Sequence, residues 1–354
     1  MKVYIDGNDG TGKSTLVKNL RGLGIDAIDR GWLSKKSLDP RVKQDGDSLT
    51  VLLDAPVDVS LARLKRRGAD MAEEYHTEES LKRFRGIYLN LAKQFGIPVV
   101  RALNQEQTLT DTLVSLWEAL PEFKRGESKI VKSLGDVFLV KLIPSLYSYT
   151  NNRSAIIEDT EIERLRCHKK IVSLLKGDGI DHAHVFISPE ENLVVSKYTE
   201  ENPPMIETVV KAVHTGTPKH RYYNMYPTNH RYKEAYVRFD WRNPLTHPDT
   251  GARLADEVLC DELAAHFCDV EACKKTARSI WNTMSEYFKS RGIDMWDICF
   301  MLSEDGLCYS EISQDCMRAK PDDGTDVDKD CFRKGSSEEK ILVNYRKFNK
   351  LIGG

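Results

Sequence analysis

The 354-residue sequence lacks the features that mark membrane, secreted and broadly nucleic-acid-binding proteins. No stretch approaches the ~20 apolar residues that a membrane-spanning helix needs. The opening residues, MKVYIDG, lack the charged and apolar regions of a secretion signal. Neither sign of charge dominates, since 52 lysines and arginines face 54 aspartates and glutamates. We therefore expect a cytoplasmic protein with no membrane contact and no global positive field for nucleic acid.

The 8 cysteines also lack the spacing of a metal or disulfide site. They lie irregularly between Cys167 and Cys331, and none forms a CxxC pair, whereas zinc sites need closer pairs. We expect reduced thiols. His182 and His184 alternate as strand residues do, and we assign them no metal role.

The chain is long enough for about two domains of roughly 100–200 residues each. Its first 120 residues alternate between short apolar strands and amphipathic helices, which predicts a doubly wound α/β domain. The expected strands are 2–5, 25–28, 49–53 and 98–101, and the expected helices are 14–23, 57–67, 79–95 and 108–120. The pattern breaks at PEFKRGESKIVK, so we predict domains of residues 1–121 and 122–354.

The second domain reads as strands followed by helices, which predicts an α+β fold. Strands are expected at 137–142, 184–187, 193–197, 208–213 and 235–240, and helices at 256–266 and 270–291. A hairpin is expected over 297–312, with its turn at 304–306.

The sequence GNDGTGKS at positions 7–14 matches the phosphate-binding pattern GxxxxGK[ST] between a strand and a helix. Its glycines let backbone N–H groups face phosphate oxygens, and the helix N-terminus adds its positive dipole end. We expect Lys13 to reach the β- and γ-phosphates and the Ser14 hydroxyl to ligate Mg²⁺. The motif therefore predicts a site for ATP or another nucleoside triphosphate. Its residues are Gly7, Gly10, Gly12, Lys13, Ser14 and Thr15.

Charged residues near this motif have two interpretations each. Asp29 and Arg30 follow the second strand, where they either hold a magnesium water and a phosphate or form a satisfied ion pair. Arg63 and residues 65–67 either close over a transferred phosphate or are the cations favoured at a helix C-terminus.

The first 120 residues resemble the thymidylate kinase-like branch of P-loop nucleotide kinases. The matching segments are GNDGTGKST, DRGWLS, VLLDAPVDVSLARLKRRG and ESLKRFRGIYLNLA. The resemblance implies that Asp9 meets the substrate sugar, that Asp29 and Arg30 are catalytic, and that Arg63 or Arg67 belongs to a lid. Only a short stretch separates Thr15 from Asp29, where the family has a long substrate-binding segment. The expected kinase domain is therefore truncated.

Two clusters in the second half are candidate binding sites because of their residue types alone. Glu311, Asp315 and Arg318 follow an apolar strand and either bind Mg²⁺ and an anionic substrate or form a solvated strand end. Lys211, Thr217, Lys219 and Arg221 surround Gly216, as in a phosphate cradle, although this is a weak pattern.

Four ordered segments resemble SAICAR synthetase, the phosphoribosylaminoimidazole-succinocarboxamide synthetase family with an ATP-grasp-related fold. They are RGESKIVKSLGDVFLV, PPMIETVVKAVHTGTPKHR, LSEDGLCYSEISQDCMR and DVDKDCFR. The resemblance implies that ATP and Mg²⁺ activate a substrate carboxylate, which the amine of aspartate then attacks. It implies that Lys211, Thr217 and Arg318 hold the substrate phosphate and that Gly216 and Arg221 also bind the substrate. It further implies that Asp315 lies beside the substrate, Glu311 at the metal, and Lys129 and Lys141 at ATP.

The sequence departs from that family at positions expected to matter. Glu127 replaces a lysine, Cys299 and Ser310 align with metal-binding carboxylates, and Gln314 replaces a proline. Three functions therefore stay open. The first is a carboxylate–amine ligase fused to a nucleotide kinase-like domain. The second is a kinase whose second half binds the acceptor, and the third is a non-enzymatic nucleotide sensor. An assembly of identical chains is also left open.

Overall fold

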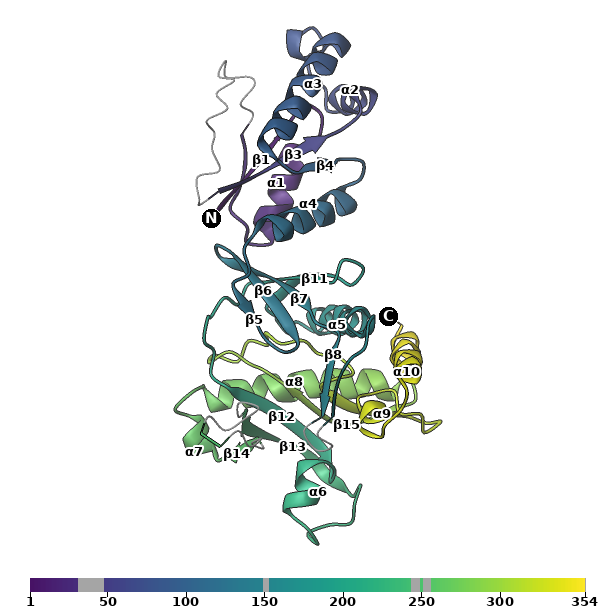
Figure 1. Cartoon of the computed structure of the whole chain (residues 1–354). Coiled ribbons are helices and arrows are strands. Elements are labelled where there is room, and N and C mark those ends of the chain that lie inside the picture. Colours follow the sequence, from purple (N-terminus) through teal and green to yellow (C-terminus); the bar gives the residue numbers. More distant parts are fainter. Residues whose placement is uncertain (31–47, 149–152, 243–248, 251–255, 354) are drawn as a thin grey trace. The chain divides into compact units, whose positions relative to one another are not determined.

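The computed structural model describes residues 1–30, 48–148, 153–242, 249–250 and 256–353, and Figure 1 labels its elements. The chain divides into two compact units. The first unit comprises Met1–Arg125 and Ile130–Val140, and the second comprises Gly126–Lys129 and Lys141–Gly354. None of the helices within the described ranges is long and apolar enough to cross a membrane.

The first unit is built on a parallel four-stranded sheet in the order β2-β1-β3-β4. Strand β3 is almost entirely buried, as expected when both faces of a parallel sheet are covered. The four strands predicted for this half are all present. Their bounds are β1 Lys2–Gly7, β2 Ala27–Asp29, β3 Ser48–Asp54 and β4 Val99–Arg101.

Four helices accompany this sheet in two contacting pairs. Helix α1 contacts α4, β1 and β2, whereas α3 contacts α2 and β3, where Leu52 packs with Tyr88 and Ala92. Helix α4 begins three residues earlier than predicted because Asn104 caps it by accepting the Gln107 N–H. The helices are α1 Lys13–Gly22, α2 Val57–Arg66, α3 Glu78–Phe95 and α4 Gln105–Ala119, with a short 3₁₀ helix, η2, at Glu74–His76.

Strands β5 (Lys124–Arg125), β6 (Lys129–Leu134) and β7 (Val137–Leu142) follow as sheet neighbours. Gly135 makes the tight β6–β7 turn with a φ of 65°.

The second unit is organised around an antiparallel sheet in the order β14-β13-β12-β15-β16. One face of this sheet is apolar, and its side chains share a core with helix α8, which lies along β12 and β15 in Figure 1. Helix α5 contacts α8, and α10 contacts α5. The elements are β12 Ile206–Val213, β13 Arg231–Trp241, β14 Glu257–Leu259, β15 Ile293–Phe300, β16 Met317–Pro321, α5 Thr160–Gly177, α8 Val270–Lys289 and α10 Glu338–Leu351.

Shorter elements complete this unit. They are the hairpins β8–β9 (Ser145–Ser148 and Arg153–Ile156) and β10–β11 (His184–Ser188 and Leu193–Ser196), and helices α6 (Thr217–Arg221), α7 (Asp261–Ala264) and α9 (Asp330–Arg333).

Three predictions for this half are wrong or incomplete. The helix expected at 256–266 is instead strand β14 followed by the short α7. The turn at 304–306 exists, but only a Leu302–Cys308 bridge flanks it, and β15 pairs with β16 instead. Helices α5 and α10 were missed, and α5 comes before the central sheet, so strands do not simply precede helices. The buried side chains of α5 include Thr160, Glu163, Arg164 and His168, which obscure the apolar period of a helix.

Candidate functional site

The glycine turn (residues 7–14) joins β1 to α1 and requires glycine at two positions. Gly7 and Gly10 have φ angles of 144° and 78°. A Cβ on Gly7 would lie 2.5 Å from the Leu53 carbonyl oxygen, and one on Gly10 would lie 2.5 Å from that of Ser60. The backbone therefore curls tightly before Gly12, the residue that precedes α1. Such a turn ahead of a helix N-terminus is suited to binding an anion.

Four predicted residues, Asp9, Lys13, Ser14 and Asp29, meet in two pairs at this turn. The Lys13 ammonium group donates to the carbonyl oxygens of Gly7 (2.8 Å) and Asn8 (2.9 Å) and lies 3.8 Å from the Asp9 carboxylate. The Ser14 hydroxyl donates to the Asp29 carboxylate at 2.9 Å. A hydroxyl beside a carboxylate fits the oxygen ligands that Mg²⁺ prefers.

Arg30, by contrast, forms an ion pair with Asp6 and lies over the Tyr4 ring, 4.8 Å from its centroid. The satisfied ion pair, one of the two interpretations of this residue, therefore describes Arg30 in this structure.

A cavity of about 840 Å³ lies beside the glycine turn. Gly10, Gly12 and Thr15 form one side of its lining, and Arg63, Arg66 and Arg67 from the end of α2 also line it. The Arg63 guanidinium donates to the Thr11 and Ala102 carbonyl oxygens at 3.0 and 2.8 Å, which fixes it as part of the wall. Arg66 and Arg67 are exposed and have no carboxylate partner within the described ranges. The cavity therefore combines backbone donors with cations.

In the second unit, the face of the central sheet opposite α8 is polar. Cross-strand register places Lys211 opposite Asp297 and Tyr236, and Asp297 opposite Arg318. Since alternate strand residues share a face, further charged and thiol side chains lie on this side. Val209 also lies on this side, and the polar face is defined by its other side chains: Glu207, Lys211, Tyr236, Arg238, Asp240, Asp297, Cys299 and Arg318.

The predicted substrate-binding residues Lys211, Gly216 and Arg318 meet on this face, around a carboxylate that the sequence did not single out. Asp297 accepts hydrogen bonds from Lys211 (2.6 Å) and from the Arg318 guanidinium (2.7 Å). Burial raises its pKa, but the two cations outweigh burial and lower the pKa to about 2. A Cβ at Gly216 would lie 3.2 Å from that guanidinium, so the turn packs directly on Arg318. Arg318 also donates to Asp330 at 3.2 Å.

The predicted residues Glu311 and Asp315 form a second cluster, held by Arg164 of α5. The Arg164 guanidinium donates to both Glu311 oxygens, at 2.8 and 2.6 Å, and lies 3.6 Å from Asp315. Burial alone would raise the pKa of Glu311, but Arg164 lowers it. Asp315 accepts a hydrogen bond from Tyr345 and lies 3.6 Å from Lys329.

The metal role predicted for Glu311 stays a prediction. Arg164 binds both of its oxygens and the Ser313 hydroxyl binds one of them, so a Mg²⁺ there would share the carboxylate with this ion pair. Cys299, which aligns with a family metal ligand, forms a hydrogen bond with Glu207, whose pKa is raised by burial.

Other predicted residues lie outside these clusters. Arg221 pairs with Glu257 at 3.3 Å and donates to the Asp256 carbonyl oxygen. Lys129 and Lys141 lie on β6 and β7. Thr217 begins α6, but the structure describes only its backbone.

Two polar-face residues carry buried atoms without hydrogen-bond partners. Arg238 and Asp240 are 8% and 5% exposed, and one guanidinium nitrogen donates to Asp240 at 2.6 Å. Among the residues that the structure describes, the other two nitrogens of Arg238 and the second oxygen of Asp240 have no hydrogen-bond partner. Leaving such groups unsatisfied costs about 1–3 kcal/mol each, so native proteins usually satisfy them with water or a ligand. The pair can offer donors to an acceptor and an acceptor to a donor.

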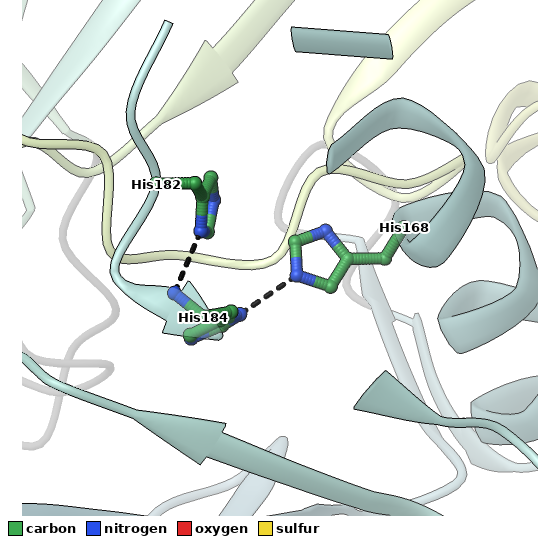
Figure 2. Close-up of side chains that lie close together, drawn as sticks. All are labelled: His168, His182 and His184. Carbon is green, nitrogen blue, oxygen red and sulfur yellow. Dashed lines mark hydrogen bonds between the residues drawn. The ribbon is translucent and has the colours of Figure 1, made fainter. Parts of the chain in front are cut away.

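The histidine cluster, His168, His182 and His184, brings three ring nitrogens within 4.8 Å of one another (Figure 2). His168 Nδ1 accepts the Ile312 N–H at 3.1 Å, so in the neutral ring Nε2 carries the hydrogen and donates to His184 at 2.7 Å. His182 likewise accepts the His184 N–H through Nδ1, and its Nε2 contacts the Ser310 carbonyl oxygen at 3.1 Å. Burial lowers the pKa of His168 to about 3. A metal on His168 would have to displace a backbone hydrogen bond, so these rings fit a neutral structural network better than a metal site.

Several important residues escaped sequence reasoning because their partners are distant in sequence. Arg164, Asp297 and Tyr345 carry the contacts of the two charged clusters, and the unpartnered atoms belong to Arg238 and Asp240. The alternation of charged with apolar residues in RYKEAYVRFDW (β13) was the one available signal, since it indicates a strand with one polar face.

Comparison with known proteins identifies the class to which this chain belongs. The family model of SAICAR synthetase matches residues 156–347, more than half of the chain. This range contains the polar face, the Glu311 cluster and Arg164. The chain therefore belongs to the SAICAR synthetase family, a family of ATP-dependent ligases.

Individual relatives agree with this assignment. The chain is 30% identical over 274 residues to the bifunctional cordycepin biosynthesis cluster protein 3 of Cordyceps militaris, an alignment that covers 64% of this chain. The chain spans only about a third (31%) of that relative's length.

Solved structures show the same fold. Phosphoribosylaminoimidazole-succinocarboxamide synthase from Ehrlichia chaffeensis aligns over 66% of this chain and 98% of its own, with 18% identity and a TM-score of 0.57. SAICAR synthase from Saccharomyces cerevisiae, complexed with SAICAR, aligns over 66% and 94%, with 14% identity and a TM-score of 0.53. A SAICAR synthetase in complex with ADP aligns over 65% and 96%, with 19% identity and a TM-score of 0.55.

Proposed function

We propose that this protein is an ATP-dependent ligase of nucleotide metabolism that joins the carboxylate of a nucleoside- or nucleotide-like substrate to the amine of an amino acid. The observation that carries the proposal is the polar face of the central sheet, which lies inside the matched family range. A buried surface rich in charges is costly for a structural sheet and is typical of a site that binds polar substrates.

The unpartnered atoms of Arg238 and Asp240 support an amino acid as the second substrate. A guanidinium with two unused nitrogens suits a carboxylate, and a carboxylate with one unused oxygen suits an ammonium group. An α-amino acid presents both groups close together. We propose aspartate, because the succinocarboxamide group named for the structural relatives corresponds to an aspartate joined through an amide.

The proposed reaction proceeds in two steps. A substrate carboxylate oxygen attacks the γ-phosphorus of ATP, giving an acyl phosphate and ADP. The amine nitrogen then attacks the acyl carbon, the bond to the phosphate oxygen breaks, and inorganic phosphate leaves. Asp315, held by Tyr345, Arg164 and Lys329, is the residue we propose beside the substrate.

The test is ADP release with ATP, Mg²⁺, aspartate and the ribosylaminoimidazole carboxylate, supplied with and without a 5′-phosphate. We expect ADP that depends on aspartate, together with a product whose mass equals the two substrates minus water. Arg238→Gln should raise the KM for aspartate at least about tenfold, as expected for loss of a charged hydrogen bond. The matched control is Arg231→Gln, because Arg231 is exposed on the same strand and pairs with Asp294. ADP release that is indifferent to aspartate would contradict the proposal.

We further propose that residues 1–121 form a truncated P-loop kinase-like domain that binds a nucleoside triphosphate, and that residues 122–354 form the ligase domain. The glycine turn, the Lys13 contacts and the cation-lined cavity favour this second activity. The Ser14 hydroxyl and the Asp29 carboxylate are the groups that would hold the Mg²⁺ of the nucleotide, and Asp9 is proposed to meet the acceptor.

The Lys13→Ala variant separates the functions that the sequence left open. A ligase retains aspartate-dependent ADP release in this variant, whereas a kinase loses all turnover. Tight ATP binding without ADP release under any of these conditions would instead indicate a nucleotide sensor.

A further inference from the structure

The cation pair Lys211 and Arg318 is already occupied by a carboxylate of the chain itself. Both cations converge on one oxygen of Asp297, at 2.6 and 2.7 Å. Gly216 leaves just enough space for Arg318, which a Cβ at that position would approach to 3.2 Å. Two cations beside a glycine turn resemble an oxyanion site, but here the anion is covalently part of the protein.

Every cation at this point already has a carboxylate partner. Lys211 and Arg318 bind Asp297, and Arg318 also binds Asp330, at 2.6–3.2 Å. The flanking cations are paired in the same way, since Arg333 donates to Asp330 at 2.7 Å and Lys320 donates to Asp330 at 2.9 Å. A ligand phosphate would therefore gain no uncompensated cation here.

Burial prevents an easy rearrangement. Lys211 and Asp297 are each 4% exposed, so a phosphate could reach Lys211 only by displacing Asp297. The displaced carboxylate would remain beside the phosphate in a poorly solvated place, where like charges repel strongly. A sugar hydroxyl carries no charge and can instead use the remaining hydrogen-bonding capacity of the same groups.

We infer that Asp297 is a specificity-determining residue that takes the place of a ligand anion between Lys211 and Arg318, so that this site selects a nucleoside carboxylate without a phosphate. The inference rests on the proposed ligase function for the identity of the substrate, and it names the class of that substrate. Asp297 does not take part in bond making or breaking. It sets which end group the site accepts.

The test compares binding by isothermal titration calorimetry in a Lys13→Ala background, which removes the glycine turn of the first unit as a phosphate site. The probes are ribosylaminoimidazole carboxylate, its 5′-monophosphate and inorganic phosphate. We expect the parent protein to bind the phosphate-free compound at least as tightly as its monophosphate. Asp297→Asn should increase affinity for the monophosphate and for inorganic phosphate at least tenfold, because it releases the two cations.

The matched control is Asp294→Asn, which removes the same charge from an exposed position on the same strand and should change neither affinity. Near-ultraviolet circular dichroism establishes that each variant is folded, and the parent comparison needs no variant at position 297. A parent protein that prefers the monophosphate tenfold, or a folded Asp297→Asn protein with unchanged phosphate affinity, would overturn the inference. If neither nucleoside binds, the proposed ligase substrate fails, and the inorganic phosphate measurement still decides the role of Asp297.

Discussion

The two units present charge in opposite ways. In the first unit, the glycine turn and the exposed Arg66 and Arg67 line a cavity, and no carboxylate within the described ranges neutralises these two arginines. In the second unit, Arg164, Lys211 and Arg318 are each bound to carboxylates. An open set of donors suits a highly charged ligand such as a triphosphate. A balanced set suits discrimination among ligands by shape and hydrogen bonding.

The largest effect is expected in the second unit, where the charges are paired. Arg164→Met leaves Glu311 and Asp315 as close buried carboxylates without their main cation. We expect the free energy of unfolding to fall by about 3–5 kcal/mol, measured by urea denaturation. The matched control is Arg166→Met on the same helix, whose half-exposed ion pair with Glu163 should contribute less than about 1 kcal/mol. Similar losses in both variants would contradict the importance of the buried pair.

The Lys13→Ala variant tests the glycine turn of the first unit, beside the cavity that the exposed Arg66 and Arg67 line. We expect the affinity for MgATP at the first unit to fall at least about 100-fold, or about 2.7 kcal/mol, because the phosphates lose their ammonium partner. Titration calorimetry should count two nucleotide sites in the parent protein and one in the variant. Lys18→Ala, at an exposed position of the same helix, serves as the control and should retain both sites. Two unaltered sites in Lys13→Ala would exclude the glycine turn as a nucleotide site.

A pair of glycine variants tests whether the glycine turn requires glycine because of its close backbone contacts. Gly10→Ala places a Cβ against the Ser60 carbonyl group at a positive φ, whereas Gly12→Ala meets nothing within 4 Å. We expect losses in unfolding free energy of about 3 and about 1 kcal/mol respectively, since only the first adds a collision to backbone strain. Thermal unfolding of the two proteins side by side measures the difference. The reverse order would show that the turn relaxes around Gly10.

The histidine cluster makes the second unit sensitive to acid. His168 is neutral in the fold because burial lowers its pKa to about 3, whereas the unfolded chain titrates near 6.5. The unfolded state therefore binds more protons below pH 6.5, and stability falls as the pH is lowered. We expect this histidine to account for about 2 kcal/mol of the loss between pH 7 and 5. His168→Gln should flatten the pH dependence by that amount, measured by urea denaturation at pH 7 and pH 5.

The smallest effect concerns Arg221, which resembled part of a phosphate cradle. It instead pairs with the exposed Glu257, so Arg221→Gln should change the KM for either ligase substrate less than about twofold. Steady-state kinetics would check this. A change of tenfold or more would return Arg221 to the substrate site.

The same contrast explains what the sequence could predict. The glycine turn is contiguous, and its residue types follow from one local backbone shape, so Gly7 to Thr15 could be predicted residue by residue. The clusters of the second unit depend on pairs such as Arg164 with Glu311, which are 147 positions apart. Motif resemblance identified Lys211, Gly216 and Arg318, but no local pattern revealed that Asp297 would lie between the two cations.

The secondary-structure predictions show the same contrast between local patterns and long-range contacts. Helices α3 and α8, which have a clear apolar stripe, were predicted almost to their ends, whereas α10 was missed. Helix α5 was also missed, because it buries arginine, glutamate and histidine toward the charged cluster. The buried charged residues that place α5 in the Glu311 cluster are also those that obscure its helical hydrophobic period.

Helix α10 affects when the second unit can fold. Tyr345 binds Asp315, Asn349 binds Glu163, and Arg153 binds the Phe332 backbone, so the two ends of this unit are joined across 179 and 186 positions. During synthesis the charged cluster stays incomplete until α10 has left the ribosome. Folding of this unit is therefore expected to be slow and all-or-none. A chain that stops before Glu338 would lack both of these α10 contacts even though the Glu311–Arg164 pair is encoded upstream.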